Sequence, residues 1–251
     1  MKNGLLYSFL TCLLVTPTPQ VFAADPPSVN VYGRIHFRLI EANDKDTTLT
    51  NAGHRIGLRG EGAMENGTEF FYTIETEYKN DSGFGKNDGM GGNSTTPSST
   101  SSTDLAEIVV RHANAGVRNK QGSITVGRQN NPLNATYVAD IFEANSGWFE
   151  RSPYRIGHAL VVKSKNMGGM KGYAGLILEG GASDTTNESL DGTVFGGSYS
   201  LGSLTINAGY LAADFISTST DKSEFSDISV GVSYSMGEMY FGVNVESATT
   251  T

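Results

Sequence analysis

The chain contains a series of segments, each about ten residues long, in which every second position is apolar. The apolar positions between residues 227 and 236 are Ile228, Val230, Val232, Tyr234 and Met236, and the residues between them are small or polar. A period of two is typical of a β-strand with one apolar and one polar face. In a soluble sandwich the apolar face packs against a second sheet, whereas in a membrane barrel it faces lipid.

This alternation predicts eleven antiparallel strands along the chain. They cover residues 29–40, 55–62, 68–78, 105–117, 123–129, 156–164, 171–179, 193–201, 204–212, 225–236 and 239–247. The connections between successive strands are alternately short and long, including a long loop at 213–224. All short turns would then lie at one end of a barrel and all long loops at the other. None of the seven prolines falls inside a predicted strand, where it would remove a ladder hydrogen bond.

Two places in the middle of the chain do not follow the alternation. His112 and Asn114 fall on the face that should meet lipid, and the strand 156–164 is apolar on both faces at Val161 and Val162. Contact with another subunit would accommodate both features. A different strand register would accommodate them equally well.

The first residues have the features of a secretory signal peptide, which we expect to comprise residues 1–24. Lys2 supplies the positive charge, and the apolar run that follows spans about 11 residues, well below the ~20 of a membrane-spanning helix. The predicted barrel then extends over residues 25–251. The only cysteine, Cys12, lies in the signal segment, so the mature chain is predicted to have no disulfide and no cysteine–metal site.

Composition and motif spacing argue against several classes of function. Lys and Arg number 18 against 26 Asp and Glu, a net charge of −8 that disfavours a nucleic-acid partner. The histidines are scattered at His36, His54, His112 and His158, with neither a catalytic string nor metal-ligand spacing beside them. We therefore expect no enzymatic activity, no metal and no cofactor.

Four motifs occur in order along the chain: residues 31–35 (VYGRI), residues 54–61 (HRIGLRGE), the turn Asn66-Gly67, and residues 122–129 (GSITVGRQ) followed by Pro132-Leu133. Together they resemble the general bacterial porins, most closely the trimeric Gram-negative porins of the β-proteobacterial type, over residues 29–247. The resemblance implies an all-β fold, an antiparallel transmembrane β-barrel of the sixteen-stranded porin type. With about eleven strands, this chain is expected to be a C-terminally truncated part of such a barrel. An open sheet of that kind leaves two unpaired edges in lipid.

The resemblance also implies a function and a site. A porin is an outer-membrane channel for passive diffusion of small hydrophilic solutes and ions, surrounded by the lipid bilayer and lipopolysaccharide and assembled as a homotrimer. The basic residues that match the wall of its constriction are Arg34, Arg55, Arg111 and Arg155. Residues 130–152 match the loop that folds into the lumen opposite this wall, and its acidic residues are Asp140, Glu143 and Glu150. Alternatively, the arginines are simply solvated or paired with Glu75, Glu77 and Glu107.

Two other functions stay open at this stage. A barrel with long loops can act as a surface adhesin or receptor without a useful pore, although the small and polar inner face favours a water-filled lumen. A soluble secreted β-sandwich has the same alternation of apolar and polar positions. Solubility that depends on detergent would separate the barrels from the sandwich.

Overall fold

The computed structural model describes residues 28–41, 47–51, 53–64, 66–78, 108–139, 152–178, 190–218 and 221–251. The expected signal peptide, residues 1–24, lies outside these ranges. In the part of the chain that is described, no helix is long and apolar enough to cross a membrane.

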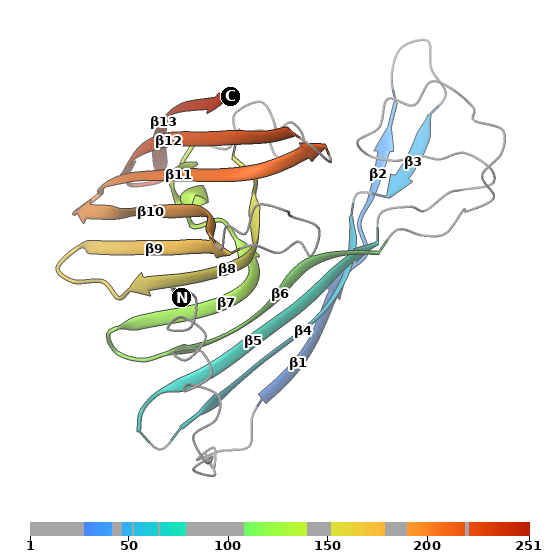
Figure 1. Cartoon of the computed structure of the whole chain (residues 1–251), viewed down its shortest axis with the longest axis horizontal. Helices are drawn as coiled ribbons and strands as arrows, with labels where there is room; N and C mark the ends of the chain where they lie inside the picture. Colours follow the sequence, from blue (N-terminus) through green and yellow to red (C-terminus); the bar gives the residue numbers. More distant parts are fainter. Residues whose placement is uncertain are drawn as a thin grey trace, which may run out of the picture.

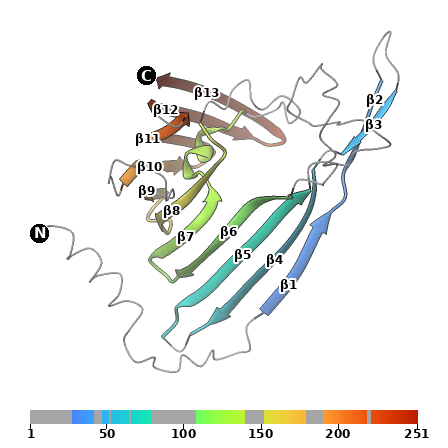
Figure 2. The same ribbon diagram turned by 45° about the vertical axis from the view of Figure 1, so that its right-hand side comes forward.

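The described residues form one large antiparallel sheet that curls around an interior (Figures 1 and 2). Its eleven strands are β1 (Ser28–Arg34), β4 (His54–Ala63), β5 (Glu69–Tyr78), β6 (Ile108–Arg118), β7 (Gly122–Asn130), β8 (Arg155–Ser164), β9 (Met170–Leu178), β10 (Leu190–Leu201), β11 (Leu204–Thr218), β12 (Asp221–Met236) and β13 (Met239–Thr250). Each strand pairs with its neighbours in chain order. The predicted number of strands and their antiparallel succession are therefore confirmed.

Two predicted boundaries are wrong. The expected first strand, 29–40, leaves the large sheet after Arg34 and continues as β2 (Phe37–Ile40), which pairs with β3 (Thr48–Asn51) in a separate hairpin. This hairpin extends beyond the end of the large sheet (Figure 2). Apolar alternation runs unbroken through Ile35, Phe37 and Leu39, so the pattern could not reveal that the strand changes its partner.

The expected long loop at 213–224 is instead the end of a hairpin. Strand pairing continues from Ala213↔Phe225 to Thr218↔Asp221, with a register shift near the tip. The residues there are mostly polar, and polar side chains gave no strand signal. Ladder hydrogen bonds need only the backbone, however, so a hairpin can extend through a polar sequence.

One face of the large sheet is apolar and exposed along its whole width. Val31 in β1 is 68% exposed and Val245 in β13 is 65% exposed, and apolar residues of the strands between them point the same way. No second sheet covers this face among the described residues. An exposed apolar surface of this extent marks contact with lipid or protein, which contradicts the sandwich interpretation and agrees with a membrane barrel.

A β-bulge accounts for His112 and Asn114. Glu75 pairs with His112 and the next residue, Thr76, pairs with Val110, so Arg111 is an extra residue in β6. Such a bulge turns two consecutive side chains to the same face. Beyond it the alternation is reversed, and Asn114 faces the interior, where its Nδ2 donates to the carbonyl of Arg128 at 2.8 Å. The register, rather than a subunit contact, explains the polar residues.

The two apolar faces of β8 have separate causes. Val162 is 43% exposed on the outer face, whereas Val161 is fully buried inside the curl of the sheet. There it belongs to an apolar cluster with Leu133, Val194 and Leu211. Leu133 comes from the 3₁₀ helix η1 (Pro132–Thr136), which packs against β10, β11 and β12. The chain thus builds its small core on the inner face, beneath a segment that folds inward.

Candidate pore constriction

Two of the predicted arginines, Arg55 and Arg111, lie in one network of ion pairs on the inner face of β4, β5 and β6. Arg111 Nε lies 2.7 Å from Glu75 Oε1, and a second nitrogen of Arg111 pairs with Glu77. Arg55 Nε lies 3.0 Å from Glu77 Oε2. Tyr32 donates its hydroxyl proton to Glu75 at 2.9 Å. The carboxylates therefore compensate much of the charge of Arg55 and Arg111. For these two arginines, the structure has the pairing with Glu75 and Glu77 that the sequence offered as an alternative.

The other two predicted arginines have no carboxylate within ion-pair distance among the described residues. Arg34 is exposed on β1, and its Nε donates to the carbonyl of Gly53 at 3.2 Å. Arg155, at the start of β8, stacks on the ring of Tyr154 at 4.9 Å, and its buried Nε has no hydrogen-bond partner in the part of the chain that is described. Arg34 also lies directly opposite Arg55 in the ladder. Like charges in such a pair are destabilising, so the fold alone does not account for them.

The sequence reasoning missed a further inner arginine, Arg59. It lies on the same face of β4 as Arg55, its guanidinium carbon is 5.3 Å from the centre of the Tyr32 ring, and it is exposed. No described carboxylate pairs with it. The alternation of residues 55–62 could have found Arg59, because it stands four positions after Arg55 and therefore on the same strand face.

The segment that follows β7 folds into the interior (Figure 1), where η1 lies against the inner wall. Asn131 caps η1, since its Oδ1 accepts from the amide of Leu133 at 3.0 Å. The Nδ2 of Asn131 donates to the carbonyl of Pro153 at 3.0 Å, so the two ends of the loop are joined. Proline at the first helical position and an asparagine cap are strong local signals for such a turn.

Polar contacts tie residues 136–139 to β12 and β13. The Oγ1 of Thr136 lies 2.6 Å from the Oγ of Ser229. The amides of Val138 and Ala139 both donate to Asn244 Oδ1 at 3.0 Å. The hydroxyl of Tyr137 donates to Glu246 at 3.0 Å. The inward path expected for this loop is thus observed as far as Ala139, whereas Asp140, Glu143 and Glu150 lie outside the described residues.

Asn244 is the acceptor for two backbone amides, and this makes it the most informative of these tethers. We expect Asn244→Ala to speed hydrogen exchange at Val138 and Ala139 by roughly tenfold or more. The two lost bonds hold the segment together and contribute about 2 kcal/mol in sum, and 1.4 kcal/mol is a factor of ten. Amides of the β4–β5 ladder serve as the internal control and should exchange as in the wild type. Unchanged protection at Val138 and Ala139 would show that the segment is held without Asn244.

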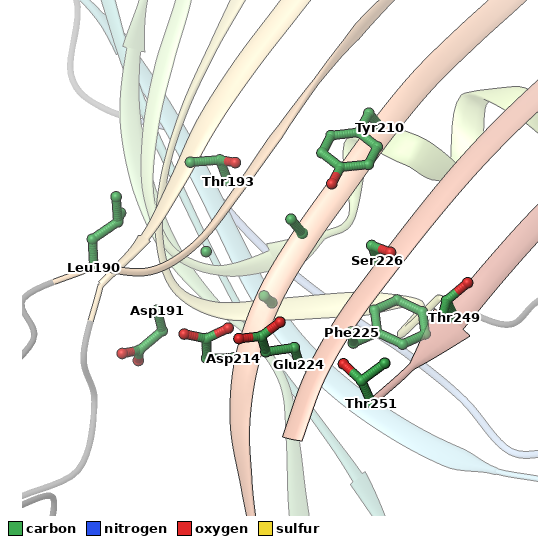
Figure 3. Close-up of a pocket in the computed structure, with 13 residues that line it drawn as sticks. Leu190, Asp191, Thr193, Tyr210, Asp214, Glu224, Phe225, Ser226, Thr249 and Thr251 are labelled. Atoms are coloured by element: carbon green, nitrogen blue, oxygen red, sulfur yellow. The ribbon is translucent and has the colours of Figure 1, made fainter. Parts of the chain in front are cut away.

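A second group of charged residues lies away from this interior, at the end of the sheet where β10 and β12 begin and β11 ends. Asp214 and Glu224 are paired in the ladder and alternate with Ala213, which packs towards the inner core, so they belong to the outer face. Figure 3 shows them beside Asp191 in a pocket of about 370 Å³. No set of three acidic, histidine or cysteine side chains in the described ranges is arranged to hold a metal ion. These acidic residues contribute to the negative net charge of the chain but do not face the arginines of the inner face.

Several solved structures share the fold. OmpF of Salmonella typhi, solved in complex with daunomycin, matches with a TM-score of 0.59 and 18% identity, over 86% of this chain and 64% of OmpF. The anion-selective porin from Comamonas acidovorans matches with a TM-score of 0.61 and 18% identity, over 90% of this chain and 69% of that porin. OmpT of Vibrio cholerae matches with a TM-score of 0.59 and 17% identity, over 92% of this chain and 67% of OmpT. The chain thus spans about two thirds of the length of these proteins, and less than two thirds of OmpF.

At the level of sequence, no curated protein matches the chain. The sequence profile of the Gram-negative porins does match, and it does so over residues 10–251. This match covers nearly the whole chain, and the curled antiparallel sheet with an inward-folded segment after β7 agrees with it. The chain belongs to the Gram-negative porins, a family of the bacterial outer membrane.

Proposed function

We propose that this chain forms the wall of a water-filled channel through which small hydrophilic solutes and ions diffuse passively. The observation that carries the proposal is the inner face of the sheet, which combines a row of arginines on β1, β4 and β6 with a chain segment that folds inward against β10 to β13. A channel narrows where such a segment approaches the wall, and the charges at that point decide which ions pass. We further propose that the channel is a homotrimer in a bilayer that contains lipopolysaccharide.

The residues that we propose for the constriction are Arg34, Arg55, Arg111 and Arg155, with Arg59 added to the wall. On the loop side we propose Asp140, Glu143 and Glu150, as the porin resemblance implies. Ion pairs with Glu75 and Glu77 reduce the contribution of Arg55 and Arg111 to the local field. Arg34 and Arg59 are exposed and unpaired by described carboxylates, so they should act most strongly on passing ions. The balance favours weak selectivity for anions.

This proposal predicts how the reversal potential responds to charge removal. In a salt gradient, changing Arg34 and Arg59 together to Gln should move the reversal potential towards cation preference, because the focused field at the constriction loses two positive charges. The protein assembled in the outer membrane is purified and measured in planar lipid bilayers. A reversal potential that stays at the wild-type value would mean that these arginines do not line the narrowest section.

Asp214→Asn is the matched control for total charge. Asp214 lies on the outer face, since it alternates with Ala213, and screening over about 8 Å at physiological salt mutes charges that are distant from the constriction. We expect this variant to leave the reversal potential almost unchanged. A shift towards anion preference about half as large as that of the double arginine variant would indicate that net charge, rather than the local wall, sets the selectivity.

A further inference from the structure

Three glycines, Gly209, Gly231 and Gly242, lie on the inner face of the consecutive strands β11, β12 and β13, and we call them the glycine lane. Gly209 is opposite Ser229, and Gly231 is two residues further along β12. Gly242 is opposite Ser233, again two residues further. The glycine lane therefore descends diagonally towards the short turns, by about 7 Å for each strand that it crosses.

The inward-folded segment lies in this lane. A Cβ atom on Gly209 would overlap the hydroxyl of Tyr173 and lie 2.6 Å from Cδ1 of Leu133. A Cβ on Gly242 would be 2.8 Å from the carbonyl oxygen of Val138. A Cβ on Gly231 would overlap the carbonyl oxygen of Thr136 and approach its Cα to 3.2 Å. At Gly231 and Gly242 the obstacle is backbone, which cannot turn aside as a side chain can. Each glycine thus permits an approach that no other residue allows.

The hydrogen bonds determine where the segment lies along the wall, and the glycines determine how closely it approaches the wall. The bonds from Ser229, Asn244 and Glu246 determine which part of the segment lies over which strand. They also hold the segment against the wall, and the atoms in between set how closely its backbone can approach. Since a carbon–carbon contact is most favourable at about 3.5–4.0 Å, a methyl group at Gly231 must push Thr136 away from the wall and into the interior.

We propose that the glycine lane sets how far residues 133–138 stand from the channel wall and thereby sets the open cross-section of the channel. This inference rests on the proposed function, in which this segment narrows the lumen. Gly231 is the main determinant, because its site is filled by the backbone of Thr136. Gly242 contributes less, because its added Cβ would approach the backbone of Val138 less closely than a Cβ on Gly231 approaches Thr136.

The test is single-channel conductance of Gly231→Ala and Gly242→Ala in the membrane-assembled protein. We expect a clear loss of conductance in Gly231→Ala and a smaller loss in Gly242→Ala. Gly172→Ala is the matched control, since Gly172 is also in a strand and the atom nearest to its added Cβ is 3.8 Å away. The control should conduct like the wild type, which separates the effect of the lane from that of alanine in a strand. Gly242→Ala introduces the milder overlap and keeps the test valid if Gly231→Ala folds poorly.

The outcomes separate this inference from the proposed function. Wild-type conductance in both Gly231→Ala and Gly242→Ala would overturn the inference. An increase in conductance would also overturn it, because it would mean that the segment leaves the lumen instead of moving further into it from the wall. If these results occur while Arg34 and Arg59 still control the reversal potential, the proposed function stands. If the wild-type protein, assembled as a closed barrel, gives no conductance steps, the proposed function itself fails.

Discussion

Val232→Lys should destabilise the folded protein by roughly 2–4 kcal/mol, the cost of a lysine on the lipid face of a barrel near the middle of the bilayer. Val232 is central in the apolar row of β12, between Ile206 of β11 and Val243 of β13, and all three side chains are exposed on the outer face. Urea unfolding of the protein folded into lipid vesicles measures the free energy. A cost below about 1 kcal/mol would mean that this face does not meet the bilayer core.

The control for this variant is Ser233→Lys, at the next position of the same strand. Ser233 points to the interior and is partly exposed, so a lysine there can reach water and should cost much less. Ser229 would be the equivalent choice from the alternation alone. It is unsuitable because its side chain is fully buried under Thr136.

Arg111→Ala should destabilise the protein by about 3 kcal/mol, the lower end of the range for breaking a buried ion pair. The side chains of Arg111, Glu75 and Glu77 are only 14%, 11% and 14% exposed. Without Arg111, Glu75 keeps the hydroxyl of Tyr32 but loses its positively charged partner. The measurement is again the free energy of unfolding in lipid vesicles.

Two variants show whether the loss comes from the uncompensated carboxylate. Adding Glu75→Gln to Arg111→Ala should restore part of the stability, and the double-mutant cycle gives the interaction energy. Arg118 also bridges two glutamates, Glu61 and Glu69, but its side chain is 40% exposed. Arg118→Ala should cost less than about 1 kcal/mol. Equal losses at Arg111 and Arg118 would contradict the role of burial.

The alternation of apolar and polar residues determined the number, order and outward face of the strands. It could do so because a side chain in a strand points to one face or the other with a period of two, and lipid demands an apolar face in every strand. The same rule brought Arg34 and Arg55 to the inner wall. It also contained Arg59, which stands on the same face of β4 as Arg55.

The alternation could not show where a strand changes its partner or its register. Arg111 is extra in its ladder, and only the pairing of Glu75 and Thr76 with β6 reveals the bulge that turns His112 and Asn114 inward. Likewise, β2 keeps the apolar period of β1 while pairing with β3. Register and pairing are properties of two strands, and a pattern read along one strand does not contain them.

Only the tertiary structure showed which residues of the inner face pack against the inward-folded segment and which of its arginines are paired. The inward-facing residue Val161 is apolar because it shares a buried cluster with Leu133 from the inward-folded segment. Residue 231 is a glycine because the backbone of Thr136 occupies the space where a Cβ atom would lie. The tertiary structure also decided that Arg55 and Arg111 are paired, whereas no described carboxylate pairs with Arg34 or Arg59. The sequence by itself determined the wall of the barrel, because each strand must satisfy lipid locally. The path of the segment inside it depends on contacts between residues about 75 to 110 positions apart, as between Thr136 and Ser229 or Tyr137 and Glu246.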